Sequence, residues 1–360
     1  MKKRKDVKKK KNKFLIIFLL LLVIFFGILG WYFFFAKEEG ENSKVLNKIV
    51  EKIEKKDEEV KKVKIVDVDS DTRNIAVMIN NHPSARKFHS GIQDAYIVYE
   101  IIVEGGYTRL MALYKDVNVS KIGSVRSSRH YFLDYALEND AVYVHWGWSP
   151  QAQEDISRLG VNNINGLTYE GKYFYRDNSL NVDYEHRGFT DSDNINAAIK
   201  QLGYRNTTDK DLLLNYVIDD IDLSSMEGSQ VATNVNIKYS NSVTTSYVYD
   251  EVNKVYLRSV NGESHVDYDT KKQYTVKNII TYQVSNYTIS GDSKGRQDIN
   301  NIGSGSGYYI SNGYAVPVLW EKSSRTSQTK YSYLDGTEIN VNDGNTFIQI
   351  QPKNQSLNIS

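Results

Sequence analysis

The fold is decided by the stretch NIAVMINNHPSARKFHSGIQDAYIVYEIIVEGGYTRLMALYKD, residues 74–116. It holds three short apolar runs, at 74–80, 95–103 and 108–114, each bounded by residues that favour turns. Gly105 and Gly106 separate the last two runs, so we predict a hairpin there. The stretch therefore predicts three buried strands with charged residues set among them.

The next stretch, KIGSVRSSRHYFLDYALENDAVYVHWGWSP at residues 121–150, introduces helices. Ser127 or Ser128 can cap a helix that runs to about residue 137, and a strand at 141–146 follows. Further helices are predicted from Ser149, which precedes a proline, and over 191–203, which ends in glycine. Because strands alternate with helices, we predict an α/β domain over residues 73–222.

The composition changes near residue 231. Short runs rich in Tyr, Val, Thr and Ile follow, and Asn261, Asn312 and Asp335 each precede a glycine. Such pairs are typical of tight hairpin turns. We predict an antiparallel all-β C-terminal domain over 231–352.

The N-terminus has the pattern of a membrane anchor. Residues 1–13 include nine basic residues and one acidic residue, and residues 14–36 carry no charge. A helix needs about 20 apolar residues to cross a bilayer, and a signal peptide has a shorter apolar core. We predict a basic cytoplasmic tail at 1–13, one transmembrane helix at 14–36, and a charged stalk or linker at 37–72. The expected location is the bacterial plasma membrane, single-pass, with both folded domains extracytoplasmic.

The overall composition excludes two classes of function. The net charge is +1, whereas nucleic-acid binders carry a clear basic excess, so no nucleic-acid partner is expected. The chain has no cysteine, which excludes a thiol nucleophile and disulfide bonds.

Several motifs resemble the YerB-like lipoprotein family. They are AVMINNHPSAR from Ala76, SGIQDAYIVYEIIVEGGYTR from Ser90, IGSVRSSRHYFLDYA from Ile122, YVHWGWSPQA from Tyr143, and the later GSGSGYYISNG and VLWEK. The resemblance implies a two-domain extracytoplasmic bacterial envelope protein of unknown function. This chain differs in having an apolar segment where the family carries a lipidated cysteine, and EHRGFT where a His-Asn pair is expected.

Two carboxylates in the hairpin are candidate catalytic residues. Glu100 and Glu104 lie four positions apart, which places them on one face. Paired carboxylates can cleave a glycosidic bond when they flank it. The alternative is a buried ion-pair network, with Arg109 across the turn as the expected partner.

A candidate anion site lies at the predicted start of the helix near residue 127. Arg126 and Arg129 flank Ser127 and Ser128, and free backbone N–H groups at a helix start attract anions. Arg109 is expected to join this site. The alternative is a capped helix with surface arginines.

Two histidines complete the ligand-binding candidates. His145 alternates with Tyr143 on one strand and is either a core residue or a ligand contact, and His186 lies in the motif that departs from the family. The histidines do not follow a metal-binding spacing, so neither a metal nor a cofactor is expected.

Three functions remain open. The first is an envelope protein that binds an anionic or glycan ligand through the Glu/Arg site. The second is an envelope enzyme, a transferase or hydrolase, that acts on cell-wall polymer. The third is a non-catalytic structural partner of membrane proteins.

Overall fold

The computed structural model describes residues 22–27, 30–31 and 62–360. Contacts divide the chain into two units, Met1–Lys62 and Val63–Ser360. Residues 22–27 and 30–31 of the first unit are helical, and the rest of the predicted tail, membrane segment and stalk up to residue 61 lies outside the described residues. Within the described ranges, no helix is both long and apolar enough to cross a membrane.

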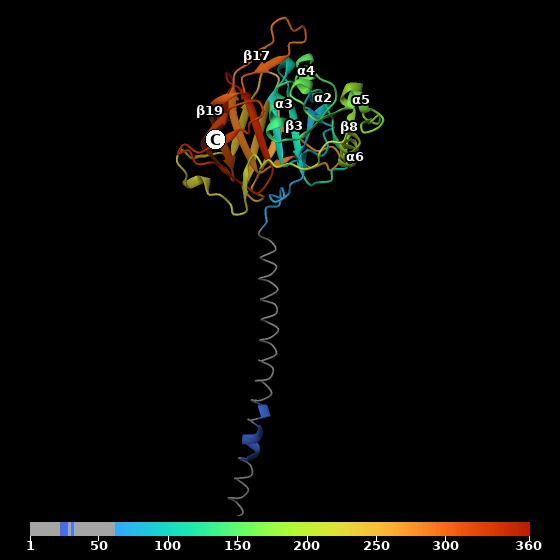
Figure 1. Cartoon of the computed structure of the whole chain (residues 1–360). Helices are drawn as coiled ribbons and strands as arrows, with labels where there is room; N and C mark the ends of the chain where they lie inside the picture. The colour runs from blue at the N-terminus through green and yellow to red at the C-terminus, as the bar shows by residue number, and fades with distance from the viewer. Residues whose placement is uncertain (1–21, 28–29, 32–61) are drawn as a thin grey trace, which may run out of the picture. The chain divides into compact units, whose positions relative to one another are not determined.

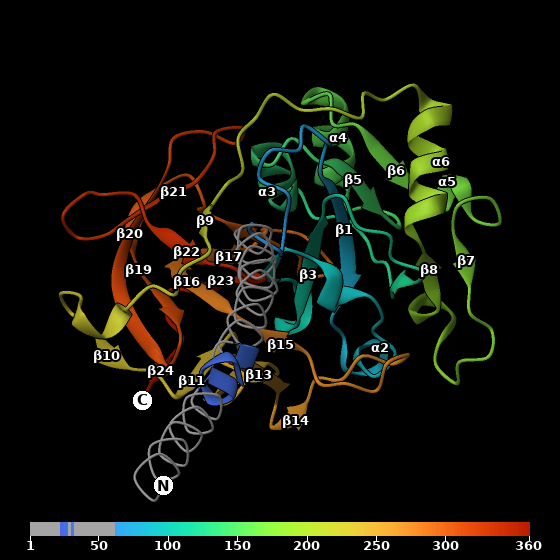
Figure 2. The ribbon, with the colours of Figure 1, turned by 90° about the horizontal axis from the view of Figure 1, so that it is seen from below.

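One mixed sheet of eleven strands runs through the unit Val63–Ser360 (Figures 1 and 2). In spatial order its strands are β10 (Gln230–Val231), β20 (Tyr314–Lys322), β19 (Gly303–Ser311), β16 (Asn278–Val284), β23 (Thr346–Pro352), β2 (Ile97–Ile102), β3 (Thr108–Tyr114), β1 (Ile75–Asn80), β5 (Val142–His145) and β6 (Asn163–Asn165), with β21 (Lys330–Ser332) beside β20. The predicted hairpin is confirmed, because β2 and β3 pair antiparallel.

The sheet joins the two predicted domains. Strand β23, from the C-terminal part, pairs parallel with β2 on one side and with β16 on the other. The C-terminal part is built of strands, as predicted, but it is not purely antiparallel. The change of composition near residue 231 therefore does not separate two sheets, because β16, β19, β20 and β23 lie in one sheet with the N-terminal strands.

A second sheet packs over one face of the first. Its strands are β14 (Glu263–Ser264), β13 (Val255–Val260), β12 (Thr244–Asp250), β11 (Asn234–Lys238) and β24 (Leu357–Ile359), with β15 (Thr275–Val276) beside β13. Alternate residues of β2 enter two different cores: Tyr99 and Ile101 enter one, and Val98 enters the other together with Tyr247 of β12. Strand β2 is thus buried on both faces.

Helices are short and gather beside the N-terminal strands (Figure 2). They are α2 (Pro83–Arg86), α3 (Phe132–Glu138), α4 (Pro150–Arg158), α5 (Gly166–Tyr169) and α6 (Ser192–Leu202), with 3-10 turns η1 (Ile92–Asp94), η2 (Glu104–Gly106), η3 (Tyr184–His186) and η4 (Leu223–Ser225). Two predicted starts are confirmed, because the side chains of Ser149 and Asp191 cap α4 and α6. Gly203 ends α6 in a left-handed conformation.

Three small sheets complete the unit: β17 (Asn286–Thr288) with β18 (Gln297–Ile299), β9 (Asn215–Val217) with β22 (Asn340–Asn342), and β4 (Ile122–Gly123) with β8 (Gly188–Thr190) and β7 (Tyr175–Arg176). The turns at Asn261 and Asn312 have positive φ and link neighbouring strands of the two large sheets, as predicted.

Candidate functional site

Glu100 lies in the middle of β2 and is completely buried. Its carboxylate forms an ion pair of 2.9 Å with Arg258 of β13, which is also completely buried. The hydroxyls of Thr108 and Thr245 donate to the same carboxylate at 2.7 and 3.1 Å. The prediction of Arg109 as ion-pair partner is therefore wrong for Glu100, because alternation along β2 turns Glu100 toward the second sheet, and it is confirmed for Glu104. Glu100 links the two halves of the chain.

Glu104 lies outside the strand, in the η2 turn, and it holds two arginines. Its carboxylate contacts Arg109 at 3.2 Å and accepts a bond of 2.9 Å from Nε of Arg129. Burial alone would raise the pKa of Glu104, but the hydrogen bonds from Arg129 and the charge of Arg109 outweigh it and lower the pKa to about 2. Glu104 is thus ionised at neutral pH and cannot serve there as a proton donor.

The contacts among Glu104, Arg109 and Arg129 also change the pKa of Arg109. Its side chain is 7% exposed, and burial followed by the nearby charge of Arg129 lowers its pKa to about 9. Arg109 also donates to the carbonyl of Ser127, and Arg129 donates to that of Ser128 at 2.7 Å. Two positive charges therefore share one carboxylate, and their donors fix the backbone at 127–128.

The segment 126–131 is not the start of a helix, so that prediction is wrong. Helix α3 begins at Phe132, and its N-terminus has no side-chain cap. Ser127 instead donates to the carbonyl of Trp146 at 3.0 Å, and Ser128 accepts from the hydroxyl of Tyr143 at 2.9 Å. Backbone bridges hold the segment between the ends of β1 and β5. These β-like bridges take up N–H groups that a helix start would leave free.

Arg126 emerges from this segment at the end of β1. Its side chain is 23% exposed, and it contacts the carboxylate of Glu185 at 3.1 Å, whose side chain is 59% exposed. The η3 turn that carries Glu185 also places His186 beside Asn80. Arg126 is thus the most exposed of the three arginines predicted as ligand contacts.

Two histidines stack beside Arg126. The rings of His82 and His186 lie 5.0 Å apart and are nearly parallel, at 9°. Tyr107 meets His82 edge to face at 4.8 Å. We call the set of His82, Glu104, Tyr107, Arg109, Arg126, Arg129, Glu185 and His186 the Arg/His cluster.

Hydrogen bonds set the proton positions on both imidazoles. The Asn80 side-chain oxygen accepts from the backbone N–H of His82, so its amide nitrogen is left to donate to Nδ1 of His186 at 2.7 Å. Nδ1 of His82 accepts from the backbone N–H of Ser84 at 3.3 Å. Both neutral rings therefore carry their proton on Nε2, where it can be donated.

The histidines are neutral at pH 7. Burial, and then the positive charge of Arg126, lower the pKa of His82 and of His186 below the usual value of 6.5. The charge of Glu185 opposes these effects, and a further negative group bound beside Arg126 would raise both pKa values. Anion binding at this cluster would therefore be coupled to proton uptake.

His145 lies apart from the cluster and is completely buried. Its ring nitrogens contact the carbonyl of Gly147 at 2.8 Å and the side-chain oxygen of Asn163 at 3.1 Å, and burial lowers its pKa. These contacts are those of a core histidine. In the described part of the chain, no group of three His, Asp or Glu residues could hold a metal ion.

Sequence reasoning missed His82, Asn80, Tyr107 and Glu185 as members of the site. The signal for the first two was available, because NNHP directly follows the first strand and loops at strand ends carry binding groups. Tyr107 and Glu185 have no comparable signal. They become neighbours only when the hairpin and the η3 turn meet at the end of β1.

Comparisons with known proteins support one family. Two models match: the N-terminal domain of DUF3048, "Protein of unknown function", at residues 63–205, and its C-terminal domain at residues 235–348. The chain is 31% identical over 298 residues to "Putative lipoprotein YerB" of Bacillus subtilis, which covers 81% of this chain and 85% of that protein. A crystal structure of YerB protein from Bacillus subtilis matches with a TM-score of 0.69 and 30% identity, over 80% of this chain and 94% of that chain. With both domain models and a relative of this identity matched over most of its length, the chain belongs to the YerB-like DUF3048 family.

Proposed function

We propose that this protein is an envelope protein, anchored through its N-terminal segment, that binds an anionic glycan at the Arg/His cluster. The basic and apolar pattern of residues 1–36 supports the anchor and the extracytoplasmic position of residues 63–360. The description of the relative as a lipoprotein agrees with a membrane-associated envelope location.

The observation that carries the proposal is the charge of the cluster. Three arginines meet only two carboxylates there, and one of these, Glu185, is mostly exposed. The exposed ion pair with Glu185 contributes little to stability and leaves Arg126 partly accessible, so a ligand carboxylate can bind Arg126 beside Glu185. Arg109 and Arg129, which are buried beside Glu104, add positive electrostatic potential to the same cluster.

The neighbouring rings suit a sugar that carries the charge. His82 and His186 present Nε2–H donors, and Tyr107 adds a half-buried ring with an apolar face and a polar hydroxyl. A few polar donors beside aromatic surface are typical of small-molecule sites. The ligand class is therefore an acidic saccharide and not a bare inorganic ion.

The test uses the full-length chain in detergent and calorimetric titration with muramic-acid disaccharide, a sugar that carries a carboxylate. Neutral chitobiose is the matched probe. We expect the acidic sugar to bind, and Arg126→Gln to weaken it at least tenfold, because a charge-assisted hydrogen bond is worth about 1.5–3 kcal/mol. Arg158→Gln is the control, since Arg158 is an exposed arginine paired within α4.

Equal binding by wild type and Arg126→Gln would refute the proposal. Incubation of the same proteins with wall polymer, followed by mass spectrometry, separates the other two functions. Release of a new product from wall polymer would favour an envelope enzyme. Absence of both binding and product would favour a structural partner of membrane proteins.

A further inference from the structure

Arg86 is a buried cation without a carboxylate partner. It lies at the end of α2 and is 9% exposed. Its Nε and one terminal nitrogen donate to the side-chain oxygen and the carbonyl of Asn81, at 3.2 and 3.1 Å. No ion pair joins it to any acidic residue that the structure describes. Burial, and then the charge of Arg258, lower the pKa of Arg86 to about 10, so it remains charged at neutral pH.

Arg86 lines a pocket between α2 and the segment 263–271. The pocket has a volume of about 260 Å³, far larger than the roughly 30 Å³ that one water molecule occupies. The exposed lysines Lys87 and Lys271 line the same pocket. Within the described residues neither forms an ion pair, and their ammonium groups lie over the rings of Phe88 and Tyr268, at 5.0 and 3.9 Å from the centroids. Three cationic residues therefore line one pocket, and none of them forms an ion pair within the described residues.

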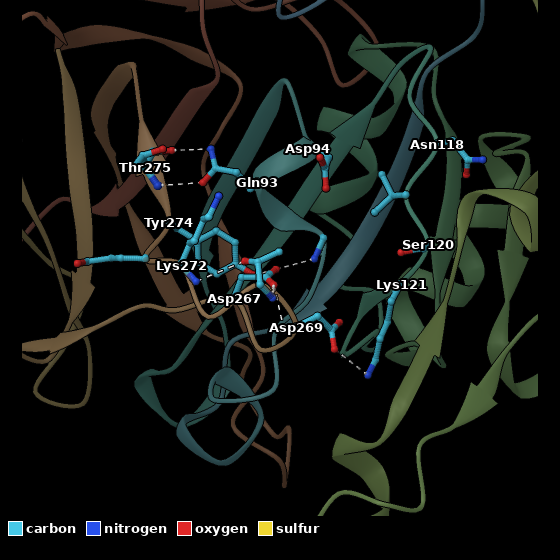
Figure 3. Close-up of a pocket in the computed structure, with 14 residues that line it drawn as sticks. Gln93, Asp94, Asn118, Ser120, Lys121, Asp267, Asp269, Lys272, Tyr274 and Thr275 are labelled. Atoms are coloured by element: carbon cyan, nitrogen blue, oxygen red, sulfur yellow. Dashed lines mark hydrogen bonds and ion pairs between the residues drawn. The ribbon is translucent and has the colours of Figure 1, made fainter. Parts of the chain in front are cut away.

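Two carboxylates also line the pocket, but neither neutralises Arg86. The Asp267 carboxylate accepts from the backbone N–H of Gly91 and from the hydroxyl of Tyr274, both at 2.9 Å, in the neighbouring pocket that Figure 3 shows. Backbone N–H groups of its own turn, at Asp269 and Thr270, occupy its other oxygen. Glu263 is exposed and lies beyond ion-pair distance of Arg86.

A buried guanidinium without a directly paired carboxylate is costly, because a desolvated charge lacks the water that would stabilise it. The more distant charges of Glu100 and Glu263 offset this cost only in part, since the pKa of Arg86 is still lowered. A bound anion would remove that cost. Arginine matches the geometry of phosphate oxygens, and two ammonium groups supply point charges for the same group. Three positive charges suit a doubly charged group better than a single carboxylate.

We propose that this pocket binds a phosphate group, with Arg86 as the buried contact and Lys87 and Lys271 at the rim. The site is separate from the Arg/His cluster and does not depend on the function proposed for it. The phosphate can be a free ion or an ester on a polymer, since both present the same oxygens.

The test is calorimetric titration of the full-length chain in detergent with inorganic phosphate, alongside thermal melting with phosphate or with chloride at equal ionic strength. We expect phosphate, but not chloride, to bind and to raise the melting temperature. Arg86→Gln should abolish both effects, and Lys87→Gln should weaken binding about threefold to tenfold. Glu263→Gln should strengthen binding, because it removes from the rim a negative charge that repels phosphate.

Controls separate this site from the cluster and from general charge effects. Arg126→Gln and Arg158→Gln should bind phosphate as the wild type does. If Arg86→Gln does not fold, the opposite changes in phosphate affinity expected for Lys87→Gln and Glu263→Gln test the proposal. Both variants should fold, because both side chains are exposed. An oligomer of glycerol phosphate is the second probe: tighter binding than free phosphate assigns the site to a polymer, and equal binding to the free ion. Absence of a phosphate effect on the wild type, or the same effect in every variant, would overturn the proposal.

Discussion

Glu100 and Glu104 are four residues apart, yet they lie in opposite environments. Glu100 is completely buried and pairs with a completely buried arginine from the C-terminal half of the chain. Glu104 is 25% exposed and pairs with two arginines from the N-terminal half. The first pair holds the two halves together, whereas the second lies in the Arg/His cluster, where we propose that a ligand binds.

The difference arises from where the strand ends. Strand β2 continues through Glu100 with sheet neighbours on both sides and a second sheet over one face. Beyond residue 102 the chain turns through two glycines with positive φ, and Glu104 lies in this turn, outside the strand. A carboxylate in the same short motif is thus buried and structural inside the strand, and partly exposed just beyond it.

The largest effect is expected from Glu100→Gln. The change leaves Arg258 buried without a counter-ion, and breaking a buried pair costs about 3–5 kcal/mol. We expect the free energy of unfolding, measured by urea denaturation, to fall by about that amount. Glu185→Gln is the matched control, because its carboxylate is mostly exposed and should change stability by less than about 0.5 kcal/mol.

A double variant sharpens this prediction. Glu100→Gln combined with Arg258→Gln should cost clearly less than the sum of the two single changes, since no unpaired charge remains. A loss below about 1 kcal/mol for Glu100→Gln would show that the pair does not hold the halves together.

The pH dependence of stability is the next largest effect. His89 and His265 lie beside this pair with ring nitrogens 2.8 Å apart, near Arg86, Arg258 and Asp267. Burial lowers the pKa of His89 to about 3, and burial with the neighbouring His89 lowers that of His265 well below 6.5. The folded pKa lies below the unfolded value, so the unfolded chain binds more protons once the pH falls below about 6.5.

Stability should therefore decrease as the pH falls from 6.5 to 5, at a slope that approaches about 1.4 kcal/mol per pH unit for each buried histidine. Urea denaturation at several pH values measures the slope. His89→Gln should reduce the slope by the contribution of one proton. Stability that stays constant or rises over this range would contradict the assignment of buried neutral histidines.

Much of the fold could be predicted from local signals. Alternating apolar runs and the two glycines identified the hairpin, and serine, aspartate and glycine at the right positions identified the ends of α4 and α6. The position of β23 between β2 and β16 could not be predicted, because strand partners distant in sequence leave no local pattern. For the same reason Arg258 was not expected as the partner of Glu100.

The site was predicted in part, on one wrong premise. Arg126 and Arg129 do lie near Arg109. Backbone bridges of the segment that carries them, and not a helix start, hold them there. Serine beside an apolar run favours a helix cap. Backbone pairing of this segment with the ends of β1 and β5 outweighs that local preference. His82 and Tyr107 join the cluster through tertiary contacts alone.

A smaller loss of stability is expected from Glu104→Gln. The change leaves two arginines without their carboxylate, but Glu104 is partly exposed, so water can replace some of the lost contact. We expect the free energy of unfolding to fall by about 1–3 kcal/mol, the usual cost of leaving a partly buried group without its partner. A loss equal to that of Glu100→Gln, measured under the same conditions, would remove the distinction between the two carboxylates.

The smallest effect on stability is expected from Arg126→Gln, which should change the free energy of unfolding by less than about 0.5 kcal/mol because its ion pair with Glu185 is largely exposed. Its effect on binding should instead be large and should depend on pH. An anion beside Arg126 raises the pKa of His82 and His186, so the wild type should bind muramic-acid disaccharide more tightly at pH 6 than at pH 8. His186→Gln should weaken this pH dependence and leave Arg126 in place. If affinity is the same at both pH values while Arg126→Gln still abolishes binding, the arginine alone receives the anion and the stacked histidines serve only to position the loop.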